Sequence, residues 1–365
     1  MQVLILSANT GGGHNSTAVA LSEYFKREGV DCETVDALKF ISDKTSEFIS
    51  WGHSYVYRKL PLLFGLGYRF EEKHSPRFIY EQCARGTDAL WQRVEEGGYD
   101  AIICVHAFAG MMVTELRRRY GARIPAFFVA TDYTCSPGVS ELEVDGFFIP
   151  HRMLLGEFVH NGIAADKLIT TGIPVRESFY EAKEPRAARL ALGLPEDRRV
   201  VLFSCGSMGC GRLDKTAALL SKSLPKDAML VVICGNNQKA YDELNAAPLE
   251  NVKVIGFTEQ MPLYMSAADL YVTKPGGLTT SEAIVKCLPM VFFDAVPGLE
   301  TKNFDFLVSS GVAVGAKSRR KLVQTLQSVL KNDRERKAQV TAMREFQSVH
   351  AAEQICRHVI GACVK

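Results

Sequence analysis

The stretch ILSANTGGGHNSTAVAL, from Ile5 to Leu21, predicts how the chain begins to fold. Apolar residues lead into three glycines, a histidine follows, and the residues after it have the pattern of a helix. A strand, a glycine-rich turn and a helix in this order begin a βαβ unit. The glycines let a ligand approach the main chain closely, and His14 falls in the first turn of the helix. His14 is then either a general base or a residue that caps its own helix.

Short apolar segments of strand length alternate with amphipathic segments of helix length along the rest of the chain. Strands are expected at 2–8, 32–37, 101–106, 126–132 and 146–151, and a second series at 200–206, 229–235, 252–257, 270–275 and 290–295. Helices are expected between them, for example at 16–29 and 110–122. This order predicts an α/β fold with two Rossmann-like domains, each a parallel sheet covered by helices.

A stretch rich in proline and charge separates the two series of strands. We expect an N-terminal domain at residues 1–173, a linker at 174–199, a C-terminal domain at 200–340 and a helix at 341–365 that returns to the N-terminal domain. Ligands bind at the carboxyl ends of the strands in such sheets. The loops that follow the strands are therefore expected to carry the chemistry.

The composition excludes several classes of protein. The chain has 365 residues, 47 % of them hydrophobic, and a net charge of +2 that gives no sign of nucleic-acid binding. No apolar run reaches the roughly 18 residues of a membrane span, and the first residues lack the pattern of a signal peptide. The ten cysteines form no CxxC pair and no metal-ligand spacing, so we expect them to be reduced in a cytoplasmic protein.

The glycines after the first strand do not match the common nucleotide fingerprints. A dinucleotide site needs a glycine where this chain has Ser16, although Asp36 at the end of the next strand keeps a nicotinamide oxidoreductase open. No lysine stands where a P-loop would place one. The loops SCGSMGCGR (204–212) and ICGNNQ (233–238) are also glycine-rich, but taken alone they are weak signals.

The strongest signal is TKPGGLTTSEA, from Thr273 to Ala283. Its Pro-Gly-Gly turn (275–277) leads from a strand to a helix that is expected to begin near Leu278 or Thr279. Amides at the start of that helix can bind a phosphate, and the hydroxyls of Thr279 and Thr280 are further donors.

Acidic and polar residues beyond this turn favour a sugar nucleotide as the ligand. Glu282 lies about one turn into the helix, where its carboxylate can accept hydrogen bonds from ribose hydroxyls. Glu300 and Asn303 follow the next strand and can contact the hydroxyls of a sugar. Each residue has a structural alternative, Glu282 as a helix-start carboxylate and Lys274 as a solvated charge. Their order along the chain nevertheless predicts a nucleotide-sugar site.

At these residues the chain resembles the monogalactosyldiacylglycerol synthases and processive diacylglycerol glucosyltransferases, and more distantly the peptidoglycan N-acetylglucosaminyltransferase. The motifs that carry the resemblance are GGGH (11–14), TD (131–132), GIPV (172–175), GSMG (206–209), GFTEQM (256–261), TKPGGLTTSEA (273–283) and PGLETKN (297–303). The resemblance implies a GT-B fold, in which two Rossmann-like domains face each other across a cleft. It also implies an inverting transfer of glucose or galactose from a UDP-sugar to diacylglycerol or a glycosylated diacylglycerol.

The resemblance further implies which residues form the site. Phe257–Met261 would hold the uracil, Glu282 the ribose and Gly277–Thr280 the diphosphate, while Glu300 and Asn303 would face the sugar. The residues expected to bind the UDP-sugar are Gly12, Gly13, Gly206, Ser207, Met208, Gly209, Gly235, Asn236, Phe257, Thr258, Met261, Lys274, Pro275, Gly276, Gly277, Leu278, Thr279, Thr280, Glu282, Glu300 and Asn303.

His14 is the candidate catalytic base, with Asp132 as its support or as an alternative base. No DxD-type metal site stands out, so no metal or cofactor is expected, and helix amides with Lys274 would stabilise the UDP leaving group. The chain departs from the family at Leu299, where a glutamine is usual, and at Cys135–Gly138, where a histidine is often found. The first departure leaves the identity of the hexose open, and the second means that an accessory histidine cannot be carried over.

The segment from Trp51 to Gln82 interleaves aromatic and basic residues, which suits an interfacial segment on anionic lipid. The residues expected at the membrane or the acceptor are Trp51, Tyr55, Arg58, Lys59, Phe64, Tyr68 and Arg69. The alternative is a buried helix pair with ordinary surface charges. With the lipid acceptor that the resemblance implies, we expect peripheral binding at the cytoplasmic face of the membrane.

Other functions remain open at this stage. A UDP-sugar epimerase of the same fold, or a glycosyltransferase with a polyprenyl-linked acceptor, would use a similar donor site. A nicotinamide oxidoreductase is disfavoured by Ser16, and a non-catalytic UDP-sugar sensor is disfavoured by His14.

Overall fold

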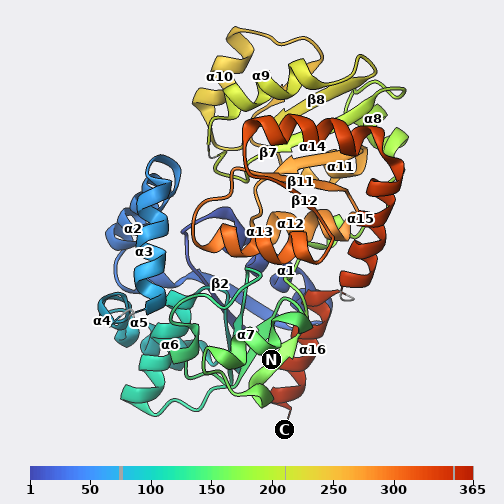
Figure 1. The fold of residues 1–365 in the computed structure, drawn as a ribbon. Coiled ribbons are helices and arrows are strands. Elements are labelled where there is room, and N and C mark those ends of the chain that lie inside the picture. Colours follow the sequence, from blue (N-terminus) through green and yellow to red (C-terminus); the bar gives the residue numbers. More distant parts are fainter. Residues whose placement is uncertain (74–76, 210, 348–349, 365) are drawn as a thin grey trace. The chain divides into compact units, whose positions relative to one another are not determined.

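The structure is a computed structural model that describes residues 1–73, 77–209, 211–347 and 350–364 (Figure 1). The side chains of residues 45, 48, 50, 53–54, 57–59, 71–73 and 77–79 lie outside the described part. The chain divides into two compact units. The N-terminal unit comprises Met1–Glu177, Pro297–Leu299 and Ser348–Lys365, and the C-terminal unit comprises Ser178–Val296 and Glu300–Gln347.

The N-terminal unit contains a six-stranded parallel sheet in the order β2-β1-β3-β4-β5-β6. The strands are β1 (Gln2–Ser7), β2 (Asp31–Asp36), β3 (Ala101–Cys104), β4 (Ala126–Val129), β5 (Gly146–Ile149) and β6 (Leu168–Thr170). The inner strands are almost wholly buried, as expected for strands with helices on both faces, whereas the edge strands β2 and β6 are partly exposed. The predicted α/β class and the inner strands of this sheet are confirmed.

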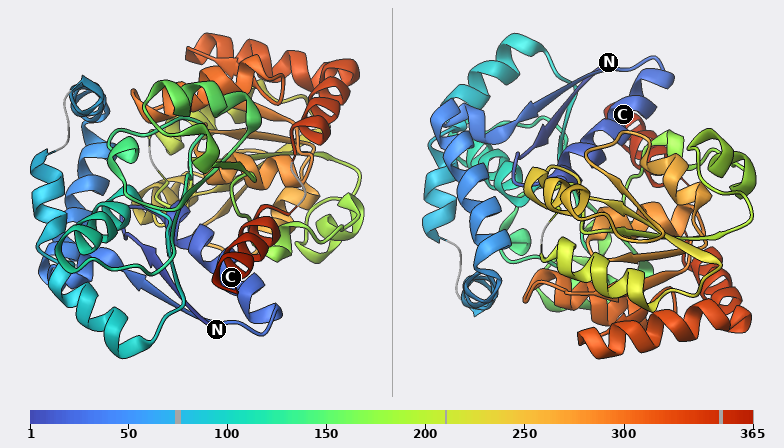
Figure 2. Two further views of the ribbon diagram at one scale, coloured as in Figure 1. Left: turned by 90° about the horizontal axis from the view of Figure 1, so that it is seen from below. Right: turned by 90° about the horizontal axis from the view of Figure 1, so that it is seen from above.

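Helices cover this sheet and extend from it. They are α1 (Gly12–Arg27), α2 (Asp43–Lys59), α3 (Pro61–Lys73), α4 (Arg77–Ala84), α5 (Thr87–Gly97), α6 (Ala107–Tyr120), α7 (Leu155–His160) and α16 (Ala351–Cys363). Short 3-10 helices are η1 (Ala37–Phe40), η2 (Val139–Glu141), η3 (Arg152–Leu154) and η4 (Ala165–Lys167). Figure 2 shows α2 and α3 as neighbouring helices, in agreement with their contacts.

The C-terminal unit contains a second six-stranded parallel sheet, in the order β12-β11-β10-β7-β8-β9. The strands are β7 (Arg199–Ser204), β8 (Ala228–Ile233), β9 (Val252–Ile255), β10 (Leu270–Thr273), β11 (Met290–Phe293) and β12 (Val314–Ala316). Its helices are α8 (Pro185–Ala191), α9 (Leu213–Ser223), α10 (Gln238–Ala246), α11 (Met261–Ala267), α12 (Gly277–Val285), α13 (Leu299–Ser309), α14 (Arg319–Lys331) and α15 (Asp333–Phe346), and η5 (Glu177–Phe179) precedes them. The short edge strand β12, like β6, is absent from the sequence prediction.

Helix α16 completes the core of the N-terminal unit. Ile355, Cys356 and Val359 are fully buried in the cluster that also contains Ile5 of β1 and Phe25 of α1. These apolar residues recur at helical spacing, so one face of α16 is buried against α1. A segment far from the others in sequence therefore contributes to the same hydrophobic core.

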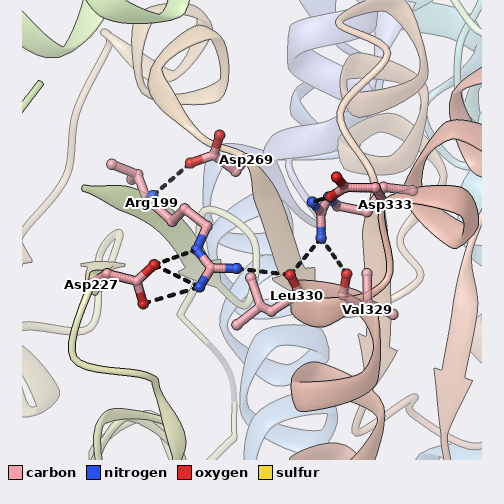
Figure 3. A network of polar contacts seen from close by, with 8 residues as sticks. Arg199, Asp227, Asp269, Val329, Leu330 and Asp333 are labelled. Carbon is pink, nitrogen blue, oxygen red and sulfur yellow. Dashed lines mark hydrogen bonds and ion pairs between the residues drawn. The ribbon is translucent and has the colours of Figure 1, made fainter. Parts of the chain in front are cut away.

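A network of charged side chains lies at the amino end of the C-terminal sheet (Figure 3). Arg199, the first residue of β7, donates hydrogen bonds to both carboxylate oxygens of Asp227 and to the carbonyl of Leu330 at 2.8 Å. Arg336 donates to the same carbonyl at 2.7 Å and pairs with Asp333. The network therefore connects β7, the start of β8 and the end of α14. It lies at the amino ends of the strands, opposite the loops that follow their carboxyl ends.

Candidate active site

His14 is held by main-chain and side-chain oxygens that lie far from it in sequence. It lies in the first turn of α1, whose N-cap is Gly11, so the alternative in which His14 caps its own helix is wrong. Its Nδ1 is 2.8 Å from the carbonyl oxygen of Val105 and 3.2 Å from Oγ1 of Thr131. A carbonyl can only accept, so the ring proton of the neutral imidazole is on Nδ1, and Nε2 carries the lone pair. Nε2 is the nitrogen that a general base needs.

Three neighbouring strands place these groups together. His14 follows β1, Val105 follows β3 and Thr131 follows β4, and these strands are adjacent in the sheet. The carboxyl ends of parallel strands all lie at the same end of the sheet. From β1 the chain adds β2 on one side and β3 to β6 on the other, so the direction in which strands are added reverses between β1 and β3. The sequence thus places a basic nitrogen at the point of the sheet where ligands of this fold class bind.

The loop that carries Asp132 is fixed from α7. The carboxylate of Glu157 accepts hydrogen bonds from the hydroxyl of Thr134 and, at 2.9 Å, from the amide of Cys135. Asp132 is the neighbour of Thr131 in this loop, so the same anchor positions both. The sequence singled out Asp132 as a support for the base or as an alternative base, and that role stays a prediction. The hydroxyl near the His14 ring belongs to its neighbour Thr131.

Buried cysteines near the ends of β3 and β8 are not nucleophiles. Burial raises the pKa of the Cys104 thiol to about 12, with Arg117 acting weakly in the other direction. Burial likewise raises the pKa of Cys234 to about 11. Both thiols stay protonated at neutral pH, and a thiolate is the reactive form of cysteine.

The glycine loops after β7 and β8 are packed against each other. Gly209 has a φ of +57°, and a Cβ there would lie 2.1 Å from the carbonyl oxygen of Cys234. Gly235 has a φ of +56°, and its Cβ would meet the carbonyl of Ser207 at 2.3 Å. The amide of Asn236 donates to the same Ser207 carbonyl at 2.8 Å. Only glycine fits this contact. Packing of the two loops therefore requires glycine at 209 and 235, whether or not these residues also bind the UDP-sugar as predicted.

Helix α12 starts one residue earlier than expected, at Gly277, with Gly276 as its N-cap. The first amides of a helix have no acceptor within it, so those of Gly277, Leu278 and Thr279 are the amides that α12 offers to an anion. The hydroxyl of Thr280 donates to the carbonyl of Gly276 at 2.7 Å. The Thr280 hydroxyl is therefore used within the helix and does not donate to a phosphate as predicted. For the Thr279 hydroxyl, donation to a phosphate stays a prediction.

A buried ion pair lies beside this turn. Nζ of Lys274 is 3.4 Å from Oε2 of Glu300, and both side chains are less than a tenth exposed. The same oxygen accepts a hydrogen bond from the amide of Val296 at 2.7 Å. Asn303 is buried and donates from Nδ2 to the carbonyl of Pro275 at 3.0 Å. Lys274, Glu300 and Asn303 thus connect the Pro-Gly-Gly turn to the segment after β11, and their contact with a sugar stays a prediction.

The other residues predicted to bind the UDP-sugar come from α12 and from the segment between β9 and α11. Glu282 is buried in α12, with 8 % of its surface exposed. Phe257 follows β9 and is 62 % exposed, as an aromatic side chain that stacks on a base would have to be. Thr258 accepts a hydrogen bond from the amide of Gln260 at 3.0 Å, and Met261 begins α11. The predicted uracil segment is therefore a short turn with one exposed aromatic side chain.

Helices α2 and α3 and Leu60 between them expose large apolar side chains. We call these residues the apolar surface: Trp51, Tyr55, Leu60, Leu62, Leu63, Leu66 and Phe70, which are between 45 % and 76 % exposed. Three of the predicted membrane residues, Trp51, Tyr55 and Arg69, are exposed, and Phe64 is half-buried. Tyr68 is buried, which speaks against a membrane contact, and its other predicted place, at the acceptor, stays a prediction. The side chains of Arg58 and Lys59 lie outside the described residues.

Sequence reasoning missed several of these residues. The leucines of the apolar surface carry no charge or aromatic ring, and the prediction rested on aromatic and basic types. The carbonyl of Val105 has no sequence signal, because any residue supplies one. Among the described residues, no helix has the length and hydropathy to cross a bilayer. The same part of the chain contains no group of three or more His, Cys, Asp and Glu side chains placed to hold a metal ion.

Two family models match this chain in succession. Residues 14–175 match monogalactosyldiacylglycerol (MGDG) synthase, and residues 200–358 match the C-terminal domain of glycosyltransferase family 28. The processive diacylglycerol beta-glucosyltransferase of Bacillus subtilis (strain 168) is 28 % identical over 345 residues, which cover 91 % of this chain and 87 % of that protein.

Solved structures show the same fold. MurG of Acinetobacter baumannii is 17 % identical with a TM-score of 0.64, and the alignment covers 99 % of each chain. UDP-GlcNAc 2-epimerase of Neisseria meningitidis, solved with UDP-GlcNAc, is 13 % identical with a TM-score of 0.63, and the alignment covers each chain fully. At these identities the likeness concerns the fold alone, and the predicted GT-B class is confirmed. The matched models and relatives together confirm the resemblance to the monogalactosyldiacylglycerol synthases and processive diacylglycerol glucosyltransferases, which are hexosyltransferases.

Proposed function

We propose that this chain transfers a glucosyl or galactosyl residue from a UDP-sugar to the free hydroxyl of diacylglycerol, with inversion at the anomeric carbon. The observation that carries the proposal is the contact of 2.8 Å between Nδ1 of His14 and the Val105 carbonyl, because a proton on Nδ1 leaves the lone pair of the ring on Nε2, where a base needs it. The curated relative in Bacillus subtilis is named for a diacylglycerol acceptor.

In the proposed reaction the acceptor oxygen attacks the anomeric carbon. Nε2 of His14 takes the hydroxyl proton as the new carbon–oxygen bond forms. The bond from the anomeric carbon to the diphosphate breaks, and its electron pair leaves with UDP. Thr131 and the Val105 carbonyl keep the ring in the required orientation, and the Val105 carbonyl accepts the Nδ1 proton of the imidazolium that forms when Nε2 is protonated.

The C-terminal unit supplies the proposed donor site. The amides of Gly277, Leu278 and Thr279 and the positive end of the α12 dipole stabilise the negative charge that develops on the diphosphate. Glu282 accepts hydrogen bonds from the ribose, and Phe257 lies against the uracil. Lys274 contributes positive charge beside the turn, at a position fixed by Glu300.

The apolar surface is the proposed membrane contact. Leu62, Leu66 and Phe70 are spaced four residues apart, so they lie along one face of α3, and all are more than half exposed. An exposed apolar helix face with nearby basic residues suits insertion into the headgroup region of an anionic membrane. This surface would bring the enzyme to an acceptor that is itself dissolved in the membrane.

Two alternatives use the same fold. A UDP-sugar epimerase would act on the donor alone, and a glycosyltransferase with a polyprenyl-linked acceptor would use another lipid. The exposed face of α3 favours a lipid acceptor over an epimerase, because an epimerase has no need of a membrane surface.

The decisive experiment incubates the purified protein with vesicles that contain diacylglycerol and with UDP-glucose, UDP-galactose or UDP-GlcNAc in turn. Mass spectrometry of the extracted lipids is expected to show hexosyl-diacylglycerol with one of the first two donors. Isomerised UDP-sugar without a lipid product would indicate the epimerase, and a product formed only with polyprenyl phosphate would indicate the other acceptor class.

Membrane binding is tested separately by flotation with vesicles of neutral and anionic lipid. A variant with serine at Leu62, Leu66 and Phe70 is expected to lose binding to anionic vesicles. Leu190 of α8 is 67 % exposed, so Leu190→Ser is a matched control that should bind as the wild type does. Equal flotation of the triple variant and the wild type would refute the membrane role of α3.

A further inference from the structure

His106 carries a second imidazole at the same edge of the N-terminal sheet. It follows β3 and is the N-cap of α6, with extended φ and ψ of −145° and 145°. Its Nδ1 accepts a hydrogen bond from the amide of Phe108 at 3.0 Å. The lone pair on Nδ1 is thus used by the helix start, and the proton of the neutral ring is on Nε2.

The His106 ring is in contact with the ring of His14. The ring centroids are 4.5 Å apart, and the planes meet edge to face at 69°. The two rings are opposite tautomers, because His14 carries its proton on Nδ1 and His106 carries its proton on Nε2. Nε2 of His14 is therefore an acceptor and Nε2 of His106 is a donor, and the two rings that carry them are in contact.

His106 is poorly placed to act as a base itself. Protonation at Nδ1 would remove the acceptor for the Phe108 amide and break the cap. It would also place a positive charge at the N-terminus of α6, where the helix dipole disfavours a cation. The neutral ring with its proton on Nε2 is therefore the form that α6 stabilises, and that form is a hydrogen-bond donor.

We propose that Nε2–H of His106 donates a hydrogen bond to the oxygen on the carbon next to the nucleophilic hydroxyl of the acceptor. This inference rests on the proposed function, in which His14 deprotonates that hydroxyl. In 1,2-diacylglycerol the neighbouring carbon carries an ester oxygen, and in a glycosylated acceptor it carries a further sugar oxygen. A donor beside the base thus selects acceptors with vicinal oxygens and orients the reacting hydroxyl toward Nε2 of His14.

The experiment separates the donor from the helix cap by substitution at His106. In the variant His106→Asn, the side-chain oxygen takes the place of Nδ1 and can still accept the hydrogen bond that caps α6. The N–H donor at the position of Nε2 is removed. His106→Ala removes both groups. The melting temperature of the Asn variant is expected to match the wild type, and that of the Ala variant to fall by a few degrees.

The activity is measured with two acceptors, 1,2-diacylglycerol and a long-chain primary alcohol that lacks a vicinal oxygen. His106→Asn is expected to lower kcat/KM about tenfold with diacylglycerol, which corresponds to the loss of one hydrogen bond, and to leave the rate with the alcohol unchanged. His151 is also an N-cap whose Nδ1 accepts an amide hydrogen bond, from Met153 at 3.2 Å. His151→Asn is therefore the matched control and should leave the ratio of the two rates unchanged.

The outcomes distinguish this inference from the proposed function. No lipid product from the wild type with any UDP-hexose would refute the proposed function itself. An active wild type with an equally active Asn variant would overturn the role of His106 alone. Parallel losses with both acceptors in the Asn variant would show a purely structural role and would overturn the inference as well.

Discussion

Nζ of Lys274 lies 3.4 Å from Oε2 of Glu300, and both side chains are less than a tenth exposed. A buried ion pair adds little net stability compared with apolar side chains of the same size, because both charges lose their hydration. Its presence beside the Pro-Gly-Gly turn is therefore better explained by function, since Lys274 gives the proposed diphosphate site a fixed positive charge. Glu300 fixes the position of that charge through the ion pair. It also anchors the segment after β11 by accepting a hydrogen bond from the Val296 amide.

The first prediction separates the stability of this pair from its function. Lys274→Met leaves Glu300 buried without its cation, so the free energy of unfolding is expected to fall by about 3–5 kcal/mol. Adding Glu300→Leu to Lys274→Met should restore most of that loss, because the buried charge is gone. Activity should remain low in the double variant. Urea titration and initial rates test this, and a double variant as active as the wild type would contradict it.

His14→Ala should lower kcat by about 10² to 10⁴ with little change in stability, since positioned acid–base catalysis contributes that much. His14→Gln is the companion variant, because an amide keeps polarity but cannot act as a base. Steady-state rates with saturating UDP-sugar are the measurement. Retention of more than a tenth of the wild-type kcat in both variants would remove His14 from the mechanism.

Thr131 is a positioning residue, and its hydroxyl is 3.2 Å from Nδ1 of His14. Thr131→Val keeps the shape but removes this hydrogen bond, which is expected to lower kcat about 2- to 10-fold while KM for the UDP-sugar stays unchanged. Thr131→Ser keeps the hydroxyl and should retain the wild-type kcat. A Val variant with the wild-type kcat would show that the hydroxyl does not position the ring, and a Ser variant as slow as the Val variant would show that the hydroxyl alone is not sufficient.

Gly209 and Gly206 form a matched pair in the loop after β7. Both have positive φ, +57° and +73°, but an added Cβ meets the Cys234 carbonyl at 2.1 Å only at Gly209 and meets nothing within 4 Å at Gly206. Gly206→Ala should cost about 1–2 kcal/mol from backbone strain alone. Gly209→Ala should cost clearly more, because backbone has to move. Equal losses in chemical denaturation would show that the clash is relieved without cost.

Asp145 gives the N-terminal unit a defined pH dependence. Burial alone raises the pKa of Asp145, but hydrogen bonds from Arg117 and from the Ala126 amide outweigh it and lower the pKa in the folded state. Because the folded pKa lies below the unfolded one, the stabilisation is present above the unfolded pKa and is lost as the pH falls through the folded pKa. Asp145→Asn should therefore destabilise by about 1 kcal/mol at pH 7 and by much less in acid. A loss that is independent of pH would contradict this account.

The fold was predictable where strands are central. Inner strands such as β1 and β8 are buried on both faces, and their sequences are continuous apolar runs. The edge strands β6 and β12 are three residues long and lack that pattern, so they were missed. Their pairing with β5 and β11 comes from the sheet and not from local propensity.

The elements that carry the candidate site were predictable where the proposed chemistry needs a particular residue type. His14, Glu282 and the Pro-Gly-Gly turn have side chains or backbones that the proposed reaction requires, and the spacing placed them on the correct elements. The groups that orient His14 could not be predicted, since the Val105 carbonyl and the Thr131 hydroxyl lie 91 and 117 positions away in sequence. Only the order of strands brings them to the ring.

The return of α16 to the N-terminal core bears on biosynthesis. Ile355, Cys356 and Val359 fill a cluster whose other members begin with Val3, so that cluster closes only after the ribosome has made α16. The N-terminal unit is synthesised first, but its hydrophobic core is complete only after the C-terminal unit has also been translated. Until then its nascent apolar surface is exposed, and a chaperone that shields the first 177 residues during synthesis would raise the yield of active enzyme.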